Sequence, residues 1–304
     1  MKLLTPIFLF LSFSLTSFGK SMIQPGAEVE KLADGMKFTE GPVWLPKEQK
    51  LIFSDIPNSV LMQWSQKAGL SEFRKSENAN GNILDLDGKI ISCQHGARNI
   101  IRIDDNGKSS VLVEKFNGKR FNSPNDVAVW KDGTLWFTDP PWGLREPHEI
   151  PGHWVYKLDP KTGKVEVLIK DLAMPNGIVF SPDYSRLYVA DTGGHKRHPE
   201  PKFHDYPDTV TCYAVNKKGN LGKKLFTIDE GSDGMAVDVK GNIYLTHGHV
   251  QVYDKDGKKI ETIETPQKPA NLCFGGKDYK TLFITARSGL YSVRLTQPGA
   301  VSLR

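Results

Sequence analysis

The sequence predicts an all-β protein, folded as a six-bladed β-propeller with four-stranded blades. Three observations lead to this prediction. One sequence motif recurs six times, and its copies begin about 40 to 57 residues apart. No long run with helical periodicity follows residue 20. That spacing is the length of a four-stranded propeller blade, and a chain of 304 residues accommodates one such domain.

Each copy begins with an oxygen-bearing side chain, usually followed by Gly or Asp, and continues into a short apolar strand. A turn such as Asp-Gly and a second apolar strand follow. The copies begin at Glu40, Asn80, Asn125, Asn176, Asp233 and Asn271, with second strands at 50–55, 89–93, 134–139, 186–191, 242–246 and 281–285. Single turn dipeptides occur in any β protein and would also suit an irregular sandwich. Six copies in phase favour the propeller.

The outer half of the blades is also visible in the sequence. Third strands are predicted at 154–158, 211–215 and 290–295, and fourth strands at 110–113, 165–169, 225–228 and 260–263. The sixth copy ends near residue 304 without a fourth strand. We expect residues 29–32, just before the first copy, to supply it and close the ring, because closure removes exposed strand edges.

The N-terminus differs from the rest of the chain. Met1-Lys2 precedes an apolar stretch over residues 3–18, and Ser17-Phe18-Gly19 forms a small-x-small cleavage pattern. This pattern predicts a signal peptide over residues 1–19, a single propeller domain over 20–304, and a periplasmic or secreted protein. The alternative is a membrane anchor, but about 16 apolar residues are short for a spanning helix, which needs roughly 20. No stable membrane insertion is expected.

Composition excludes other classes of protein. The net charge of +5 is spread along the chain without a run of five basic residues, which argues against nucleic acid as a partner. Cys93, Cys212 and Cys273 lie among apolar neighbours in predicted strands, so buried thiols are expected rather than a disulfide framework. The sequence does not indicate an oligomeric state.

The first residue of each copy carries the chemistry. Innermost strands line the channel of a propeller, so residues in one phase of the repeat form a ring around its axis. Here the ring holds two carboxylates and four carboxamides, all hard oxygen donors. Calcium fits this set best, because it accepts six to eight oxygens in flexible geometry, while Mg²⁺ and Zn²⁺ remain alternatives.

Several motifs resemble the regucalcin/gluconolactonase family, particularly its bacterial gluconolactonase-type branch. The resemblance runs from about residue 35 to residue 295 and is carried by the segments 38–44, 122–127, 136–140, 174–178 and 231–235. It implies that Glu40, Asn176 and Asp233 bind the metal, with Asn125 as a fourth oxygen donor. The chain departs from the family at Gln94, where many bacterial relatives have Glu, and at Ser123, where the regucalcin branch has Arg.

By this resemblance the substrate is a sugar lactone, with glucono-1,5-lactone first. The metal would act as a Lewis acid on the lactone carbonyl, Asn125 would orient the substrate, and Asp233 would accept a proton from water, with a metal-bound hydroxide as the alternative. Two other functions stay open: a metal-dependent phosphotriesterase, and a non-catalytic sugar or calcium binder. No Gly-x-Ser-x-Gly motif suggests a serine hydrolase.

Further polar residues lie near the expected channel mouth. His95, Arg98 and His247 are candidates to contact the substrate, and Trp142 is a candidate apolar wall. The segment 193–208 contains three His and three Pro and is expected to form an inserted surface loop over the mouth. In contrast, the aspartates that end second strands in three blades, at positions 55, 139 and 191, are expected to cap turns.

Overall fold

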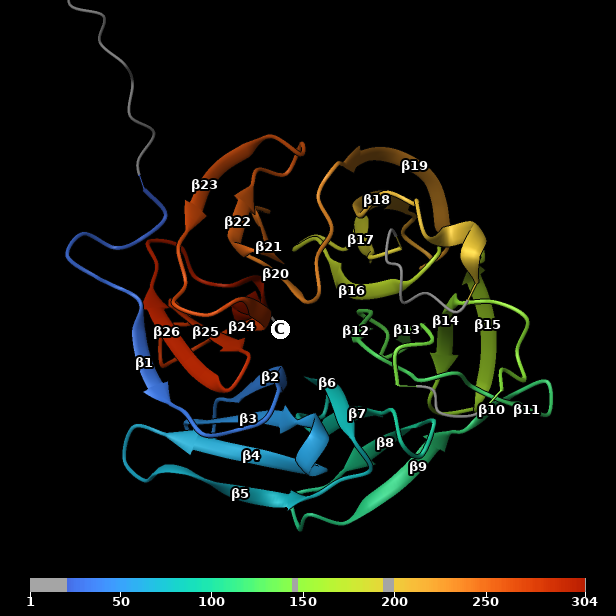
Figure 1. Ribbon diagram of the computed structural model, residues 1–304, viewed down its shortest axis with the longest axis horizontal. Helices are drawn as coiled ribbons and strands as arrows, with labels where there is room; N and C mark the ends of the chain where they lie inside the picture. Colours follow the sequence, from blue (N-terminus) through green and yellow to red (C-terminus); the bar gives the residue numbers. More distant parts are fainter. Residues whose placement is uncertain (1–20, 144–146, 194–199, 304) are drawn as a thin grey trace, which may run out of the picture.

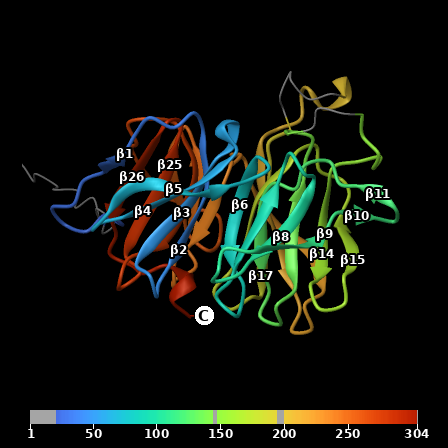
Figure 2. The same cartoon turned by 90° about the horizontal axis from the view of Figure 1, so that it is seen from below.

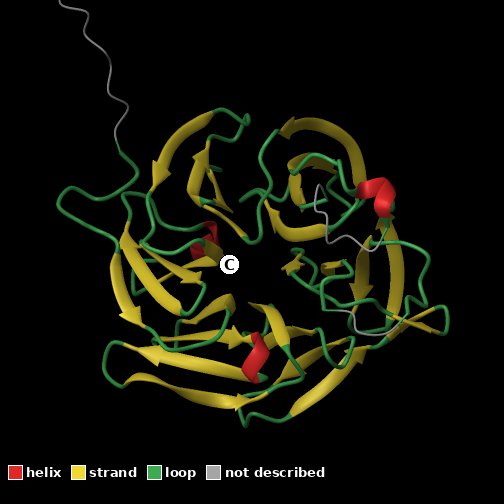
Figure 3. Ribbon diagram, viewed as in Figure 1, coloured by secondary structure: helices red, strands yellow, loops and turns green. Residues whose placement is uncertain are grey.

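A computed structural model describes residues 21–143, 147–193 and 200–303 of the chain. Six four-stranded antiparallel sheets surround a central channel (Figure 1). The strand that begins each repeat is the innermost strand of its sheet. Figure 3 shows that almost all regular structure is strand. The predicted all-β, six-bladed propeller is confirmed.

The first three blades follow the predicted order along the chain. Blade one contains β2 (Thr39–Leu45), β3 (Lys50–Asp55), β4 (Val60–Ser65) and β5 (Gly69–Lys75). Blade two contains β6 (Ala79–Leu84), β7 (Ile90–Gln94), β8 (Asn99–Ile103) and β9 (Ser109–Val113). Blade three contains β12 (Val127–Val129), β13 (Leu135–Asp139), β14 (Trp154–Asp159) and β15 (Lys164–Ile169).

The other three blades complete the circle. Blade four contains β16 (Pro175–Phe180), β17 (Arg186–Asp191), β18 (Thr209–Val215) and β19 (Leu221–Ile228). Blade five contains β20 (Met235–Val237), β21 (Ile243–His247), β22 (His249–Tyr253) and β23 (Lys259–Ile263). Blade six contains β24 (Pro269–Gly275), β25 (Thr281–Ala286) and β26 (Gly289–Arg294) from the end of the chain.

The ring is closed by the beginning of the chain. Strand β1 (Glu30–Ala33) pairs antiparallel with β26 as the outer strand of blade six, with Glu30 opposite Ser292. The predicted closure is therefore confirmed, one residue later than expected. The sequence did not predict the small hairpin of β10 (Lys115–Phe116) and β11 (Lys119–Arg120), or the 3-10 turns η1 (Ile56–Asn58), η2 (Pro201–Phe203) and η3 (Ala300–Leu303).

Apolar side chains pack between neighbouring blades. The rings of Trp130 and Trp136 in blade three lie 5.1 Å, centroid to centroid, from Phe180 in blade four. Trp44 in blade one stacks on Phe283 in blade six at 5.2 Å. Such contacts hold neighbouring blades together, and the contact between Trp44 and Phe283 also joins the first and last parts of the chain.

Glycine follows the ring residue in several blades because a side chain there would collide with the next blade. A Cβ on Gly234 would lie 2.0 Å from the side chain of Asn271 in the next blade, and one on Gly81 would lie 2.6 Å from the carbonyl oxygen of Asn125. At these two positions one blade approaches the next so closely that only glycine fits. This close approach brings the ring residues together.

The aspartates at the ends of second strands are caps, as expected. The two carboxylate oxygens of Asp139 accept hydrogen bonds from the backbone N–H groups of Asn122 and Ser123, both at 2.8 Å. Asp191 accepts equivalent bonds from the N–H groups of Ala173 and Met174 at 2.9 and 2.7 Å. Asp55 caps the backbone of residues 37 and 38 in the same way. Each cap fixes the segment that leads into an inner strand.

The propeller has two different faces (Figure 2). We call the face with η1, η2 and the loops between second and third strands the upper face. The lower face carries the turns between first and second strands and also η3, near the C-terminus. Gly299 just before η3 donates a hydrogen bond to the carbonyl of Tyr279 at 2.9 Å, which holds the end of the chain at the lower end of the channel.

Other predictions concern single residues and the N-terminus. All three cysteines are free; Cys93 and Cys212 are buried as expected, whereas Cys273 is half-buried. In the described ranges, no helix is long and apolar enough to cross a membrane. The predicted signal peptide, residues 1–19, lies outside the described residues.

Candidate functional site

The six ring residues lie at the beginning of the inner strands or two residues before them, as predicted. Glu40, Asn80, Asn176 and Asn271 belong to β2, β6, β16 and β24, while Asn125 and Asp233 precede β12 and β20. Five of the six are buried, and Asp233 is half-buried. They divide into two hydrogen-bonded groups.

The first group is centred on the two carboxylates. Oε2 of Glu40 accepts hydrogen bonds from the backbone N–H of Gly41 at 2.7 Å and from Nδ2 of Asn271 at 2.9 Å. Oδ1 of Asp233 accepts from Nδ2 of Asn176 at 2.9 Å. The Asn176 carboxamide donates through nitrogen to a carboxylate, so its oxygen is left for another partner, whereas Oδ1 of Asn271 accepts from the backbone N–H of Leu272 at 2.8 Å.

Both carboxyl groups hold their protons more tightly than usual. Burial, followed by the nearby charge of Asp233, raises the pKa of Glu40 well above its ordinary value. Burial also raises the pKa of Asp233, although the hydrogen bonds from Asn176 and with Glu40 oppose the shift. Two carboxylates this close and this buried repel each other unless a proton or a cation lies between them.

The second group is centred on His95. Its Nε2 lies 3.1 Å from Nδ2 of Asn80 and 3.5 Å from Nδ2 of Asn125. Burial lowers the pKa of His95 to about 4, so the imidazole is neutral at pH 7 and Nε2 can accept from both amides. Gly143 lies against the imidazole of His95, where a Cβ on residue 143 would come within 2.6 Å of the imidazole atoms.

This contact gives His95 a place that the sequence had not indicated. The structure places the ring of His95 against two ring carboxamides, and its contact with a substrate stays a prediction. Asn80 and Asn271, which the resemblance left unassigned, contact His95 and Glu40 respectively. Asn271 therefore holds another member of the ring in position, and Asn80 holds the neighbouring His95.

In blade three, Asp126 follows the ring residue at the position that glycine occupies in other blades. Its Oδ1 accepts from the N–H of Val127 at 2.9 Å, and its Oδ2 reaches into blade four to the N–H of Ile178 at 3.3 Å. Burial is the main reason why the pKa of Asp126 is raised to about 7, and the charge of Asp233 adds to the shift. A third carboxyl group thus lies beside the ring.

The remaining candidates lie on the upper face. The Arg98 side chain is buried, with Nε 2.5 Å from the carbonyl oxygen of Phe121 and Nη1 3.5 Å from Glu149. His247 is exposed, with Nδ1 4.0 Å from Glu230. Trp142 is half-buried in the loop that also contains Gly143. Contacts of Arg98, His247 and Trp142 with a substrate stay predictions.

The inserted segment is only partly described. Residues 194–199, including His195 and His198, lie outside the described residues. The following turn η2 lies on the upper face, the face where a covering loop was expected (Figures 2 and 3).

Sequence reasoning missed two cations near the ring. Lys268 and Arg287 are exposed side chains whose charges act on Asp233 and oppose the rise in its pKa. Both belong to connecting segments around blade six, outside the repeated motif. No spacing in the sequence distinguishes them from other surface Lys and Arg residues.

The donor set fits a hard divalent cation. Two acidic side chains and four carboxamides converge on the channel, and among the described residues neither acidic group forms an ion pair. No three His, Cys, Asp or Glu side chains gather in a metal-binding cluster in that part of the chain. A cation in the channel would therefore depend on carboxamide oxygens, which suits calcium better than zinc.

Comparisons with known proteins agree with this picture. A family model described as the SMP-30/Gluconolactonase/LRE-like region matches residues 38–288. The gluconolactonase of Zymomonas mobilis subsp. mobilis is 31% identical over 310 residues, covering 90% of this chain and 83% of the relative.

Solved structures show the same fold. A gluconolactonase from Xanthomonas campestris has a TM-score of 0.80 and 31% identity, over 90% of this chain and 91% of that one. A calcium-binding protein, regucalcin, from Agrobacterium tumefaciens has a TM-score of 0.71 over 88% of this chain and 95% of that one. At 22% identity, this second likeness shows the fold alone.

Proposed function

The chain belongs to the SMP-30/gluconolactonase/LRE-like family, and on that basis we propose that it hydrolyses a sugar lactone in the upper part of its channel. The observation that carries the proposal is the Glu40–Asp233 pair, with each carboxylate held by a carboxamide of a neighbouring blade. Glucono-1,5-lactone is the leading substrate, because two relatives that are each 31% identical to this chain are named gluconolactonases.

We further propose that calcium is the resident ion. Glu40, Asn176 and Asp233 would hold it, and Asn125 would offer a further oxygen. When bound, calcium would polarise the lactone carbonyl and stabilise the negative charge that develops on its oxygen. The positive charge would also remove the repulsion between the two buried acidic side chains.

The reaction adds water to the lactone carbonyl and breaks the ring C–O bond, giving a hydroxy acid. Asp233 would act as the general base that takes the proton from the attacking water. The carboxamide of Asn125 orients the carbonyl or ring oxygen of the substrate. Neutral His95 accepts from the amide nitrogen of Asn125, which turns the amide oxygen away from His95.

The cellular location is a separate proposal. The charged start, the apolar stretch over 3–18 and the Ser17-Phe18-Gly19 pattern support removal of residues 1–19 and a periplasmic or secreted domain.

The test is an initial-rate assay of proton release with purified protein. Gluconolactone, galactonolactone and a phosphotriester are compared, each with calcium and with a chelator. We expect turnover of at least one sugar lactone, lost with the chelator and restored by calcium. Turnover of the phosphotriester alone would assign the site to phosphoester hydrolysis, and no turnover of any substrate would indicate a binding protein.

A further inference from the structure

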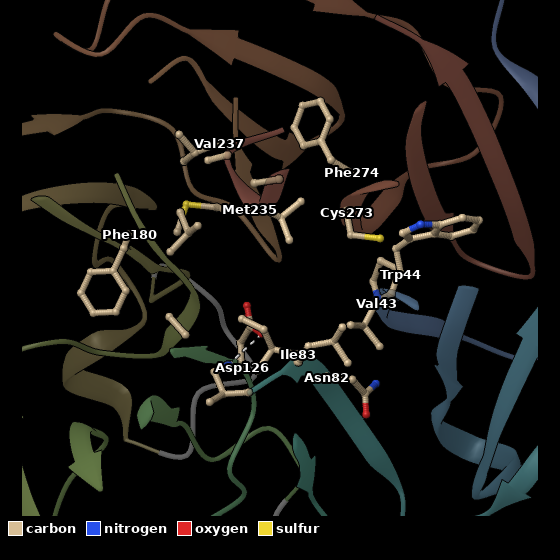
Figure 4. Close-up of a pocket in the computed structure, with 18 of the residues that line it drawn as sticks. Val43, Trp44, Asn82, Ile83, Asp126, Phe180, Met235, Val237, Cys273 and Phe274 are labelled. Carbon is tan, nitrogen blue, oxygen red and sulfur yellow. Dashed lines mark hydrogen bonds between the residues drawn. The ribbon is translucent and has the colours of Figure 1, made fainter. Parts of the chain in front are cut away.

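The lower half of the channel contains a chamber of about 500 Å³. It begins below the ring and opens on the lower face, on the opposite side of the molecule from the His95 loop and η2. Each blade contributes an apolar side chain to its wall: Val43, Ile83, Val127, Phe180, Met235 and Phe274. Figure 4 shows five of these, all but Val127, labelled around the cavity.

Size and lining match those of small-molecule sites. Such pockets measure roughly 300–1,000 Å³ and are lined mainly by apolar side chains with a few polar groups. The rim carries exposed apolar side chains as well, because Leu86 and Val301 are 54% and 36% exposed, next to the charged residues Asp85 and Lys131. Apolar surface of this kind, left accessible at the end of a channel, is typical of a binding site.

The inner end of the chamber determines which ligands fit. Asp126 and Asn271 line it, and Figure 4 shows the carboxyl group of Asp126 turned towards the cavity. The neighbouring Glu40 and Asp233 are acidic side chains as well. An anionic amphiphile such as a fatty acid would place its carboxylate against like charge, whereas a neutral molecule with an N–H or O–H group could donate to Asp126.

We propose that this chamber is a second ligand site, for a compact, uncharged apolar molecule with one hydrogen-bond donor. Its ligand enters from the lower face between Leu86 and Val301 and lies against Ile83, with its donor directed to Asp126. The site is separate from the upper mouth where a lactone would bind. The proposal therefore does not depend on the reaction.

Cys273 provides an internal reporter. It lines the chamber and is half-buried, whereas Cys93 and Cys212 are buried outside it. Burial raises the pKa of the Cys273 thiol, so a thiol reagent is used at alkaline pH, and a ligand in the chamber should slow the modification of Cys273.

The test uses the full chain without its first 19 residues and N-phenyl-1-naphthylamine, a neutral aromatic molecule with one N–H. The probe is excited directly, and its fluorescence is measured as protein is added. We expect saturable binding of one molecule per chain and at least a threefold slower reaction of Cys273 with a thiol reagent. Dodecanoate should not compete. Absent or unsaturable binding, or efficient competition by dodecanoate, would overturn the proposal.

Two variants locate the bound probe. Ile83→Trp fills the chamber and should weaken binding at least tenfold. Val111→Trp places the same side chain in the same blade on outer strand β9, where Val111 is 54% exposed; it should bind like the wild type. Circular dichroism and thermal unfolding confirm that both variants are folded. Equal binding by both variants would place the probe elsewhere and overturn the assignment.

Discussion

Replacing His95 tests how the ring is held together. In His95→Leu the side chain keeps a comparable bulk but has no acceptor, so the Nδ2 group of Asn80, now 3.1 Å from His95, loses its partner. Leaving a buried donor unpaired costs about 2 kcal/mol. For a chain of this size that corresponds to a melting temperature lower by about 4 °C.

The same change should affect calcium binding. Asn125 lies 3.5 Å from His95 Nε2, a long contact that orients its carboxamide rather than holding it tightly. Freed from His95, the amide samples several orientations, and we expect calcium to bind about tenfold more weakly, equivalent to about 1.4 kcal/mol. His95→Gln keeps an acceptor and should retain most of the affinity.

Thermal unfolding in chelator and calorimetric titration of calcium measure the two effects on the same preparations. His95→Leu with unchanged melting temperature and affinity would refute the positioning role. A loss in His95→Gln as large as in His95→Leu would also contradict it, because hydrogen bonding would then not be the cause.

Three further predictions concern other parts of the account. The raised pKa of Asp126, about 7 against 3.8 for an ordinary aspartate, means that the folded state keeps a proton that the unfolded state has lost. The stability of the wild type in chelator should therefore fall as the pH rises from about 4 to about 7. In urea unfolding, Asp126→Asn should be as stable as the wild type at pH 4 and up to about 4 kcal/mol more stable at pH 8. A stability difference between the two proteins that does not change with pH would disprove this. Gly234→Ala should reduce calcium affinity more than tenfold, because its Cβ would lie 2.0 Å from Asn271. The control is Gly222→Ala, whose Cβ has its nearest contact at 3.2 Å and which should bind calcium normally. Similar calcium affinities of the two variants would argue against the close contact between blades. N-terminal sequencing of the exported protein should begin near Lys20, and a mature cytosolic protein that keeps Met1 would contradict export.

The blades could be predicted because the information for them is local. Each copy places an oxygen-bearing residue, an apolar strand, a turn and a second strand in a fixed order, and β3 and β17 have the predicted bounds. Closure by β1 followed from counting strands, since the last blade lacked one. Only the structure supplied the reason for the glycines, because their contacts lie in the next blade.

The site could be predicted in part. The phase of the repeat identified the ring, but it could not show that Asn271 holds Glu40 or that His95 lies against Asn80, since these contacts depend on side-chain packing between blades. The lower chamber was also missed. Its wall consists of ordinary strand residues, and its mouth is completed by η3 near the end of the chain.

The most direct test of the central claim, that the ring is the reaction centre, is gluconolactone hydrolysis by Asp233→Asn at saturating calcium. Asp55→Asn is the matched control, a buried aspartate that caps backbone N–H groups outside the ring. We predict a rate at least 100-fold below wild type for Asp233→Asn and a rate within a fewfold of wild type for folded Asp55→Asn, since only Asp233 contributes charge and a proton acceptor to the reaction. Wild-type turnover by Asp233→Asn would contradict the account.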